Sequence, residues 1–154
     1  MKVIGVIAAA CAFAFAQPPL PRPAPSLNVL SPCKGQVTVA AFIVTTCPHC
    51  QRFTRNVMEP MYTGKEICAV AIAFDEGGDA ARFASAQGLT FPVYRIERKF
   101  VREFLGLTGP DRIIGTPQVV VIDKRGRIQA QSKPEGSPLL LQREVLHEIV
   151  ERLR

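Results

Sequence analysis

Two continuous apolar runs, residues 37–44 (VTVAAFIV) and 67–74 (ICAVAIAF), constrain the fold of this chain more than any other feature of its sequence. Uninterrupted runs of this length are typical of strands buried on both faces, as in parallel sheets that helices cover on two sides. Between them, residues 51–61 carry Phe53 and Val57 at helical spacing. This order predicts a β-α-β unit in which the two strands are parallel neighbours.

The rest of the chain completes one α/β domain. Residues 116–122 (TPQVVVI) predict a third strand, which a turn at 123–126 joins to residues 127–131 in a hairpin. The other expected elements are a helix at 79–87 closed by Gly88, a brief extended piece at 91–94, a helix at 99–105 stopped by Gly106, and an amphipathic helix over 139–153. The predicted fold class is α/β, a central mixed β-sheet flanked by helices in the order βαβα, then α, a ββ hairpin and α.

The first 16 residues have the form of a signal peptide. An apolar stretch follows Lys2 and ends in Ala14-Phe15-Ala16, an A-x-A cleavage pattern. A retained membrane anchor is one alternative, although a run of about 14 apolar residues is short for a span that needs roughly 20. Lipid attachment at Cys11 is another, since residues 8–11 (AAAC) loosely resemble a lipobox. We expect an exported, periplasmic or extracytoplasmic protein with a signal peptide at 1–16, a proline-rich linker at 17–25 and a folded domain at 26–154.

The length, net charge and cysteine count of the chain limit the functions that it can have. At 154 residues the chain has room for one domain, which we expect to be a monomer. Its net charge of +6 is modest and comes without a dense Lys/Arg run, which argues against nucleic acid as a partner. Loss of the signal peptide would leave Cys33, Cys47, Cys50 and Cys68, and an even number of cysteines in an exported domain indicates disulfide chemistry.

Cys47-Pro48-His49-Cys50 lies at the junction of the first strand and the following helix. A disulfide exchanger needs one thiolate that attacks and a second thiol that resolves the mixed disulfide. At a helix start, unpaired N–H groups and the helix dipole lower the pKa of the first cysteine, while the second lies inside the first turn. Pro48 suits this turn because it lacks an N–H, and a protonated His49 would stabilise the thiolate and raise the reduction potential.

Two other roles are open for this cysteine pair. Zinc needs four ligands, and the further candidates Cys33, Cys68, His49 and His147 form no second C-x-x-C or H-x-x-H pattern. A purely structural bridge gains little stability from closing so short a loop. We therefore expect redox-active cysteines, without a metal and without a cofactor.

Thr116-Pro117 opens the third strand, where a proline removes one donor of the hydrogen-bond ladder. We expect this proline to be edge-like, bulged or cis. A cis-proline beside the cysteines would let its neighbouring backbone pair with a substrate chain. An ordinary proline at a strand start is the alternative.

Several motifs, in this order, resemble the TlpA/ResA branch of the thioredoxin superfamily. They are the apolar strand followed by Cys47-x-x-Cys50, residues 88–93 (GLTFPV), residues 115–117 (GTP) before a strand, and residues 122–127 (IDKRGR). The resemblance implies a thioredoxin fold, Pro117 as the family's cis-proline, and Glu76 at the place of an acidic residue that this branch keeps near its cysteines. A solvated loop carboxylate is the alternative for Glu76.

The chain also departs from the thioredoxin pattern. It has no tryptophan, and Ala41 stands where thioredoxin carries a buried Asp, for which Glu76 could substitute as a proton acceptor. The Cys-Pro-His-Cys tetrad is similar to that of the DsbA oxidases, but the chain lacks room for their helical insertion. The family context favours reduction and the tetrad favours oxidation, so the direction of electron flow stays open.

Cys33 precedes the first strand and Cys68 lies near the start of the second. If these strands are parallel neighbours, both cysteines lie at the edge opposite Cys47. We predict a structural Cys33–Cys68 disulfide, and two free buried thiols are the alternative.

Together these features predict an exported thiol:disulfide oxidoreductase that acts through Cys47 and Cys50. Its expected partners are client proteins with thiols or disulfides and a membrane or soluble redox partner. The alternative from another class is a non-catalytic thioredoxin-like binding module whose Cys47–Cys50 bridge stays closed.

Overall fold

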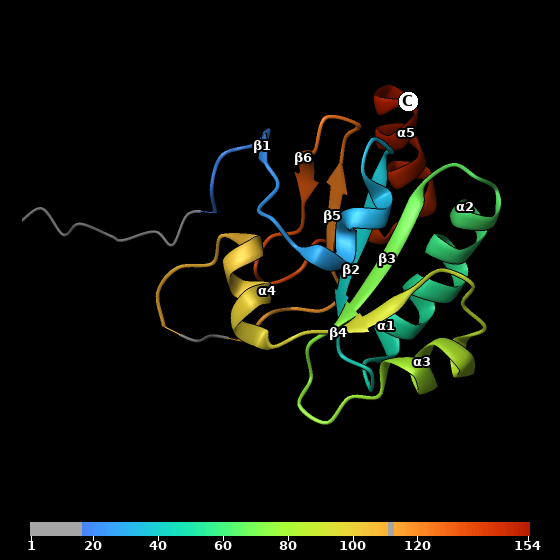
Figure 1. The fold of residues 1–154 in the computed structure, drawn as a ribbon, viewed down its shortest axis with the longest axis vertical. Helices are drawn as coiled ribbons and strands as arrows, with labels where there is room; N and C mark the ends of the chain where they lie inside the picture. The colour runs from blue at the N-terminus through green and yellow to red at the C-terminus, as the bar shows by residue number, and fades with distance from the viewer. Residues whose placement is uncertain (1–16, 111–112) are drawn as a thin grey trace, which may run out of the picture.

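A six-stranded mixed sheet forms the centre of the structure, a computed structural model that describes residues 17–110 and 113–154. Its strands lie in the order β1-β6-β5-β2-β3-β4 (Figure 1). They are β1 Arg22–Pro23, β2 Thr38–Ile43, β3 Cys68–Ala73, β4 Val93–Arg95, β5 Gln118–Ile122 and β6 Arg127–Gln131. The expected signal peptide, with Cys11, lies outside the described residues.

The pairing of the strands confirms the predicted mixed sheet. β2 and β3 are parallel from the Thr38/Cys68 pair to the Ile43/Ala73 pair, and β4 continues the parallel part beside β3. β5 is antiparallel to β2 and to β6, so the last two long strands form the predicted hairpin. The carboxyl ends of β2 and β3 therefore meet at one edge of the sheet.

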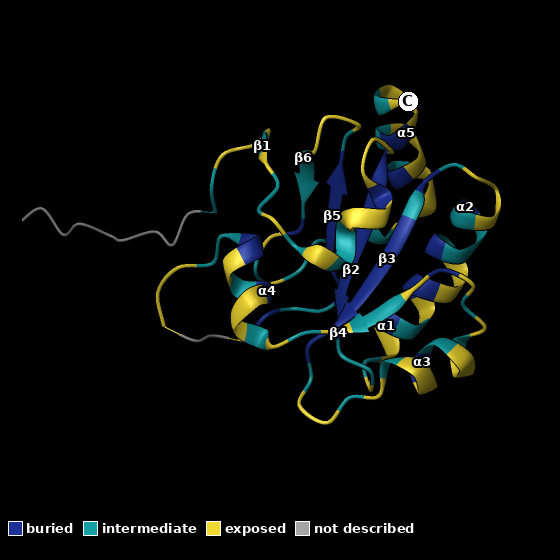
Figure 2. Ribbon diagram, viewed as in Figure 1, coloured by how far each residue is buried: buried dark blue, intermediate teal, exposed yellow. Residues whose placement is uncertain are grey.

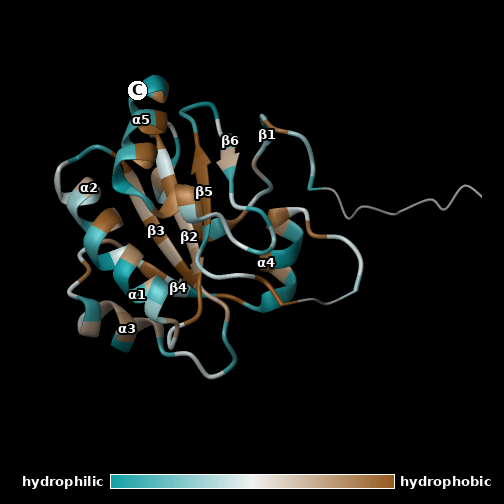
Figure 3. Cartoon of the chain, turned by 180° about the vertical axis from the view of Figure 1, so that it is seen from behind, coloured by the Kyte–Doolittle hydropathy of each residue, from teal (hydrophilic) through white to brown (hydrophobic). Residues whose placement is uncertain are grey.

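Helices cover both faces of the sheet, because the side chains of each central strand alternate between two apolar cores. The helices are α1 Pro48–Phe53, α2 Glu59–Thr63, α3 Ala80–Gln87, α4 Arg98–Leu105 and α5 Arg143–Leu153. Val39 and Ile43 of β2 join the core under α1, α2, α3 and α5, while Phe42 joins the core under α4. The central strands are buried and apolar as the sequence predicts (Figures 2 and 3).

The helix after the cysteine motif is longer than expected and changes its winding. It runs through α1, a π-helical turn at Thr54–Met58 and α2, where the sequence pattern predicts only residues 51–61. In the wide turn, the N–H of Glu59 donates to the carbonyl of Thr54, five residues back. Pro60 follows and has no N–H to give to the preceding turn. The wide turn thus accommodates a proline inside the helix.

The predicted closing helix over 139–153 is wrong in its first turn. Residues Pro138–Leu141 form a short 3-10 helix, and α5 begins only at Arg143, after an extended Gln142. Three consecutive leucines cannot share one face of an α-helix. The break buries Leu140 in the core and leaves Leu139 65% exposed.

Residues 17–25, the expected proline-rich linker, lie against the domain. Arg22–Pro23 forms the short strand β1 at the edge of the sheet beside β6, an edge position that proline tolerates. The Arg22 guanidinium donates to the carbonyl of Phe104 at 2.9 Å and to Oε1 of Gln131 at 2.7 Å. The proline-rich segment is thus anchored to α4 and β6.

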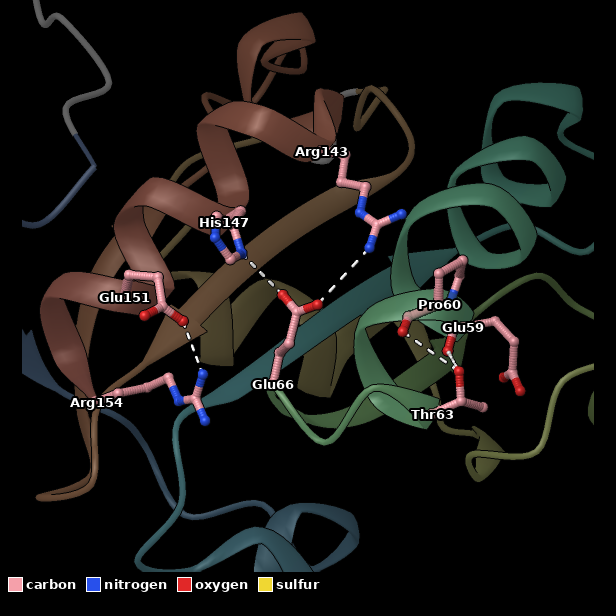
Figure 4. Close-up of polar contacts among 8 residues, drawn as sticks. All are labelled: Glu59, Pro60, Thr63, Glu66, Arg143, His147, Glu151 and Arg154. Carbon is pink, nitrogen blue, oxygen red and sulfur yellow. Dashed lines mark hydrogen bonds and ion pairs between the residues drawn. The ribbon is translucent and has the colours of Figure 1, made fainter.

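Glu66, in the turn before β3, attaches α5 to the sheet (Figure 4). Its carboxylate lies 2.8 Å from Nδ1 of His147 and 3.7 Å from a guanidinium nitrogen of Arg143, both on α5. The turn before β3 lies at the amino edge of the parallel strands, opposite the edge that carries Cys47. His147, one of the zinc candidates in the sequence, therefore has a structural partner far from the cysteine pair.

The structure joins Cys33 and Cys68 in a disulfide with a Cα–Cα distance of 5.7 Å. Cys33 ends the 3-10 helix Asn28–Cys33 and Cys68 begins β3, at the amino edge where the parallel arrangement places both. The bridge closes a loop with a sequence separation of 35 that contains β2, α1 and α2.

Within the described residues, no helix has the length and hydropathy that a membrane span requires.

Replacing both Cys33 and Cys68 by serine should lower the free energy of unfolding by about 2–4 kcal/mol, since the open chain regains the entropy that the bridge removes. Urea unfolding under non-reducing conditions measures this difference. The matched control is the Cys47→Ser, Cys50→Ser variant, whose loop is too short for a comparable effect. Equal unfolding midpoints for the wild type and the Cys33/Cys68 variant would contradict a structural role.

Candidate active site

Helix α1 begins just beyond the carboxyl end of β2 (Figure 1), and Cys47 is its N-cap residue. Its own N–H donates to the carbonyl of Val44 at 3.0 Å, which closes the loop between strand and helix. Its sulfur accepts the N–H of Cys50 at 3.4 Å, as an N-cap side chain does. Pro48 occupies the first helical position. The structure therefore places the motif at the strand-to-helix junction that the sequence predicts.

The pKa of the Cys47 thiol lies below its ordinary value. Partial burial works in the opposite direction and is the largest single influence. Hydrogen bonds from the Cys50 thiol and the Thr116 hydroxyl, together with the N–H groups of Cys50 and His49, outweigh it because each stabilises the thiolate. Cys47 is half-buried, so its sulfur combines a favoured anion with access to solvent.

Cys50 differs from Cys47 in both respects. It is fully buried under the first turn of α1, and this burial raises the pKa of its thiol to about 12. Its hydrogen bond to Cys47 and the negative charge of a Cys47 thiolate raise this pKa further. Both cysteines are free thiols in the structure. One turn of helix thus holds a thiol whose pKa is lowered beside one whose pKa is raised.

Thr116 and Pro117 lie against Cys47, from a loop distant in the sequence. The Thr116–Pro117 peptide bond is cis, one of the three forms that the sequence leaves open. The Thr116 hydroxyl donates to the Cys47 sulfur at 3.4 Å, and the Cys47 thiol can donate to the Thr116 carbonyl at 3.7 Å. Thr116 is half-buried and Pro117 is buried. The structure therefore brings the two sequence motifs together at one sulfur.

Sequence reasoning misses a second set of contacts in the loop before Cys47. The carboxylate of Asp75, just beyond β3, accepts the N–H of Thr45 at 3.1 Å and its hydroxyl at 2.5 Å. The side chain of Gln51 donates to the Thr45 carbonyl at 3.2 Å. These bonds fix the loop from both sides. The parallel pairing of β2 with β3 was the available signal, because it brings residues 44–46 and 75 to the same edge.

His49 is exposed on the outer side of α1, and its Nδ1 lies 3.0 Å from a guanidinium nitrogen of Arg52. The two side chains line a hollow of about 210 Å3 together with Phe53, Val57, Asn56 and Leu141. His49 and Arg52 thus give this hollow a polar rim, and Phe53, Val57 and Leu141 give it an apolar floor.

Glu76, which the family resemblance places near the cysteines, lies in the turn after β3. It is exposed, and it lines a different hollow with Val44, Arg95 and residues of α4. No hydrogen bond or ion pair in the described part of the chain connects it to Cys47 or Cys50. The preceding residue, Asp75, faces the cysteine loop instead, because the turn at 75–78 directs adjacent side chains to different sides.

Metal ligands do not gather around the cysteines. Across residues 17–110 and 113–154, no three His, Cys, Asp or Glu side chains come close enough to hold a metal ion. Cys33 and Cys68 are bonded to each other, and His147 contacts Glu66. The described residues therefore do not supply the four ligands of a zinc site.

Solved structures share the fold of this chain over most of its length. They include a thioredoxin-family thiol:disulfide interchange protein of Chlorobium tepidum TLS, with 22% identity and a TM-score of 0.63 over 86% of this chain and 96% of that one. A secreted Mycobacterium tuberculosis disulfide oxidoreductase homologous to E. coli DsbE has 16% identity and a TM-score of 0.58, with 80% and 86% covered. An uncharacterized conserved protein of Geobacillus kaustophilus has 19% identity and a TM-score of 0.67, with 88% and 82% covered.

No protein-family model matches the sequence, and no curated protein matches it. The similarity to the solved structures, together with the observed strand order, shows that the chain has the thioredoxin fold. The predicted fold is therefore confirmed.

Replacing Thr116 by valine, which keeps the shape and removes the hydroxyl, should raise the pKa of Cys47 by about 1 unit, since a hydrogen bond to the thiolate is lost. The measurement is the alkylation rate of Cys47 against pH in the reduced protein, read from its own peptide by mass spectrometry. The rate should fall off at a higher pH than in the wild type, while Cys50 stays unreactive at neutral pH. Thr90→Val, at a threonine bonded to Glu59, is the matched control; equal profiles for Thr116→Val and the wild type would contradict the assignment.

Proposed function

We propose that the protein is an exported thiol:disulfide oxidoreductase that exchanges disulfides with client proteins through Cys47 and Cys50. The observation that carries this proposal is the opposite pKa shifts of two thiols in one helical turn. A purely structural bridge does not require an accessible sulfur with a lowered pKa beside a buried thiol with a raised one. The thiol:disulfide functions named for the Chlorobium and Mycobacterium structures add support.

In the reducing direction, the Cys47 thiolate attacks one sulfur of a client disulfide. A bond forms between Cys47 and that sulfur, the client S–S bond breaks, and the other client sulfur leaves as a thiolate that takes a proton from solvent. The N–H of Cys50 and the hydroxyl of Thr116 hold the attacking sulfur as an anion before the attack. The ionised fraction of Cys47 attacks without a base at this step.

The second step depends on how the first step changes the pKa of the Cys50 thiol. A mixed disulfide leaves no charge on Cys47, and this removes two of the influences that raise the pKa of Cys50. Cys50 then loses its proton to solvent more easily and attacks the Cys47 sulfur. The Cys47–Cys50 disulfide forms, the client leaves with its second thiol, and two electrons have passed to the client. The buried thiol is thus activated only after Cys47 is engaged.

The same steps run in reverse when an oxidised Cys47–Cys50 pair meets a client with two thiols. The direction is set by the reduction potentials of the client and of the redox partner, a membrane or soluble protein. Stabilisation of the Cys47 thiolate favours the reduced form and therefore raises the potential of the pair. A potential above about −300 mV is expected, since structural disulfides lie below that value.

Client docking is proposed at Thr116 and Pro117, with the hollow beside His49 as a neighbouring subsite. Thr116 contacts the reactive sulfur with both its hydroxyl and its carbonyl, so a client bonded to Cys47 meets this backbone first. The hollow beside His49 has an apolar floor, including Leu141, that suits a client side chain.

The wild-type protein should catalyse disulfide exchange with insulin or with a reduced client, and Cys47→Ser should abolish both reactions because the attacking sulfur is lost. Cys50→Ser should accumulate a mixed disulfide with the client, visible by mass spectrometry, because the resolving thiol is lost. The Cys33→Ser, Cys68→Ser variant is the control and should retain exchange at temperatures where it is folded. A wild-type protein that is silent in both assays would overturn the proposal and favour the non-catalytic binding module.

Export is proposed from the signal-peptide pattern of residues 1–16. Expression of the full chain in a bacterial host with a periplasm should yield a mature protein that begins at Gln17, since the A-x-A pattern ends at Ala16. The intact mass of the periplasmic protein measures this. A chain that keeps Met1 and stays with the membrane, or one that begins with a lipid-modified Cys11, would contradict cleavage after Ala16.

A further inference from the structure

Gln118 is a fully buried polar side chain at the first position of β5, directly after Pro117. It lies opposite Phe42 of β2, and the next three residues of β5 are valines. A buried amide without hydrogen bonds costs stability, so the contacts of this side chain indicate why it is tolerated there.

The amide nitrogen of Gln118 donates to carbonyls of two loops. It lies 2.7 Å from the carbonyl of Gly115, 2.8 Å from that of Lys133 and 3.2 Å from that of Pro134. The N–H of Gly115 also donates to the Pro134 carbonyl at 2.8 Å. One side chain therefore ties the loop before β5 to the loop after β6.

The two loops meet backbone to backbone. A Cβ atom on Gly115 would lie 2.1 Å from the carbonyl oxygen of Glu135, so no side chain fits between them. The Oε1 atom of Gln118 is buried and has no partner in the described structure. The amide nitrogen of Gln118 donates hydrogen bonds to the three carbonyls around it. Carbonyls accept but do not donate, so they offer nothing to its oxygen.

We propose that Gln118 is a positioning residue for the proposed exchange reaction: its amide holds Gly115, and thereby keeps the adjacent Thr116 hydroxyl within hydrogen-bond distance of the Cys47 sulfur. Gly115 and Thr116 are consecutive, so a displaced Gly115 carbonyl moves the peptide plane that carries Thr116. Without the amide, the carbonyls of Gly115 and Lys133 lose a donor, and the Gly115–Pro134 backbone bond is left to hold the two loops. Only the kinetic effect expected in the exchange reaction rests on the proposed function.

The test is Gln118→Met, which keeps the length of the side chain and removes its donors. In the reduced protein, the pH midpoint of Cys47 alkylation should rise by about 0.5 to 1 unit, so that alkylation below the midpoint slows by about 3-fold to 10-fold. In insulin reduction, KM should rise more than kcat falls, because the proposed docking loop is displaced. A wild-type alkylation profile in folded Gln118→Met would overturn the proposal.

Gln131→Met is the matched control, because Gln131 lies in the neighbouring strand β6 and its amide donates to the Leu105 carbonyl at 2.8 Å, away from Cys47. Its alkylation profile should equal that of the wild type, and an equal shift in both variants would overturn the proposal. If circular dichroism shows that Gln118→Met does not fold, Gln118→Asn, which keeps the donors on a shorter stem, carries the test. A shift in its midpoint supports a positioning role, and an unchanged midpoint overturns it. Alkylation requires no client, so an inactive wild type would overturn the proposed function and leave this result intact.

Discussion

Burial of β2 on both faces is the constraint on which the rest of the structure depends. Val39 and Ile43 contribute to one core and Phe42 to the other, so this strand leaves no place for a charged or reactive side chain along its length. Polar chemistry is therefore confined to the ends of the strand. Cys47 follows at the carboxyl end, where the chain leaves the sheet and begins a helix.

The two edges of the parallel strands have different roles: one carries structural contacts and the other carries the reactive cysteine. At the amino edge, the Cys33–Cys68 disulfide and the contacts of Glu66 with α5 hold elements together. At the carboxyl edge, Cys47 meets Thr116, and Asp75 fixes the loop before the motif. Parallel pairing produces this separation, since it gathers the starts of β2 and β3 at one edge and their ends at the other.

Among the described residues, neutral donors and no charged partner contact the Cys47 sulfur. The N–H of Cys50 and the hydroxyl of Thr116 point at the sulfur, and each depends on backbone that other contacts hold in place. The loop of Thr116 is tied to the loop after β6 through Gln118 and Gly115. A buried amide in the sheet thus belongs to the same hydrogen-bond system as the reactive sulfur.

Local patterns in the sequence were sufficient for most of the framework. The apolar runs predict β2 and β3, and Gly88 and Gly106 end α3 and α4 in the left-handed conformation that glycine adopts readily. The start of α5 was placed too early, because the leucines of residues 139–141 satisfy a helical period but pack as a 3-10 turn. Composition predicts a proline-rich linker at residues 17–25, but the contacts of this segment with α4 and β6 are too distant in the sequence to be read from composition.

The sequence by itself determined the α/β class and the position of Cys47-Pro48-His49-Cys50 at a strand-to-helix junction, because both follow from the spacing of neighbouring residues. Only the tertiary structure decided which side chains surround the Cys47 sulfur. Thr116 lies 69 positions away in the chain, and Asp75 rather than Glu76 faces the loop before Cys47. Such contacts depend on the strand order and on the direction of each loop, which no local pattern of hydrophobicity specifies.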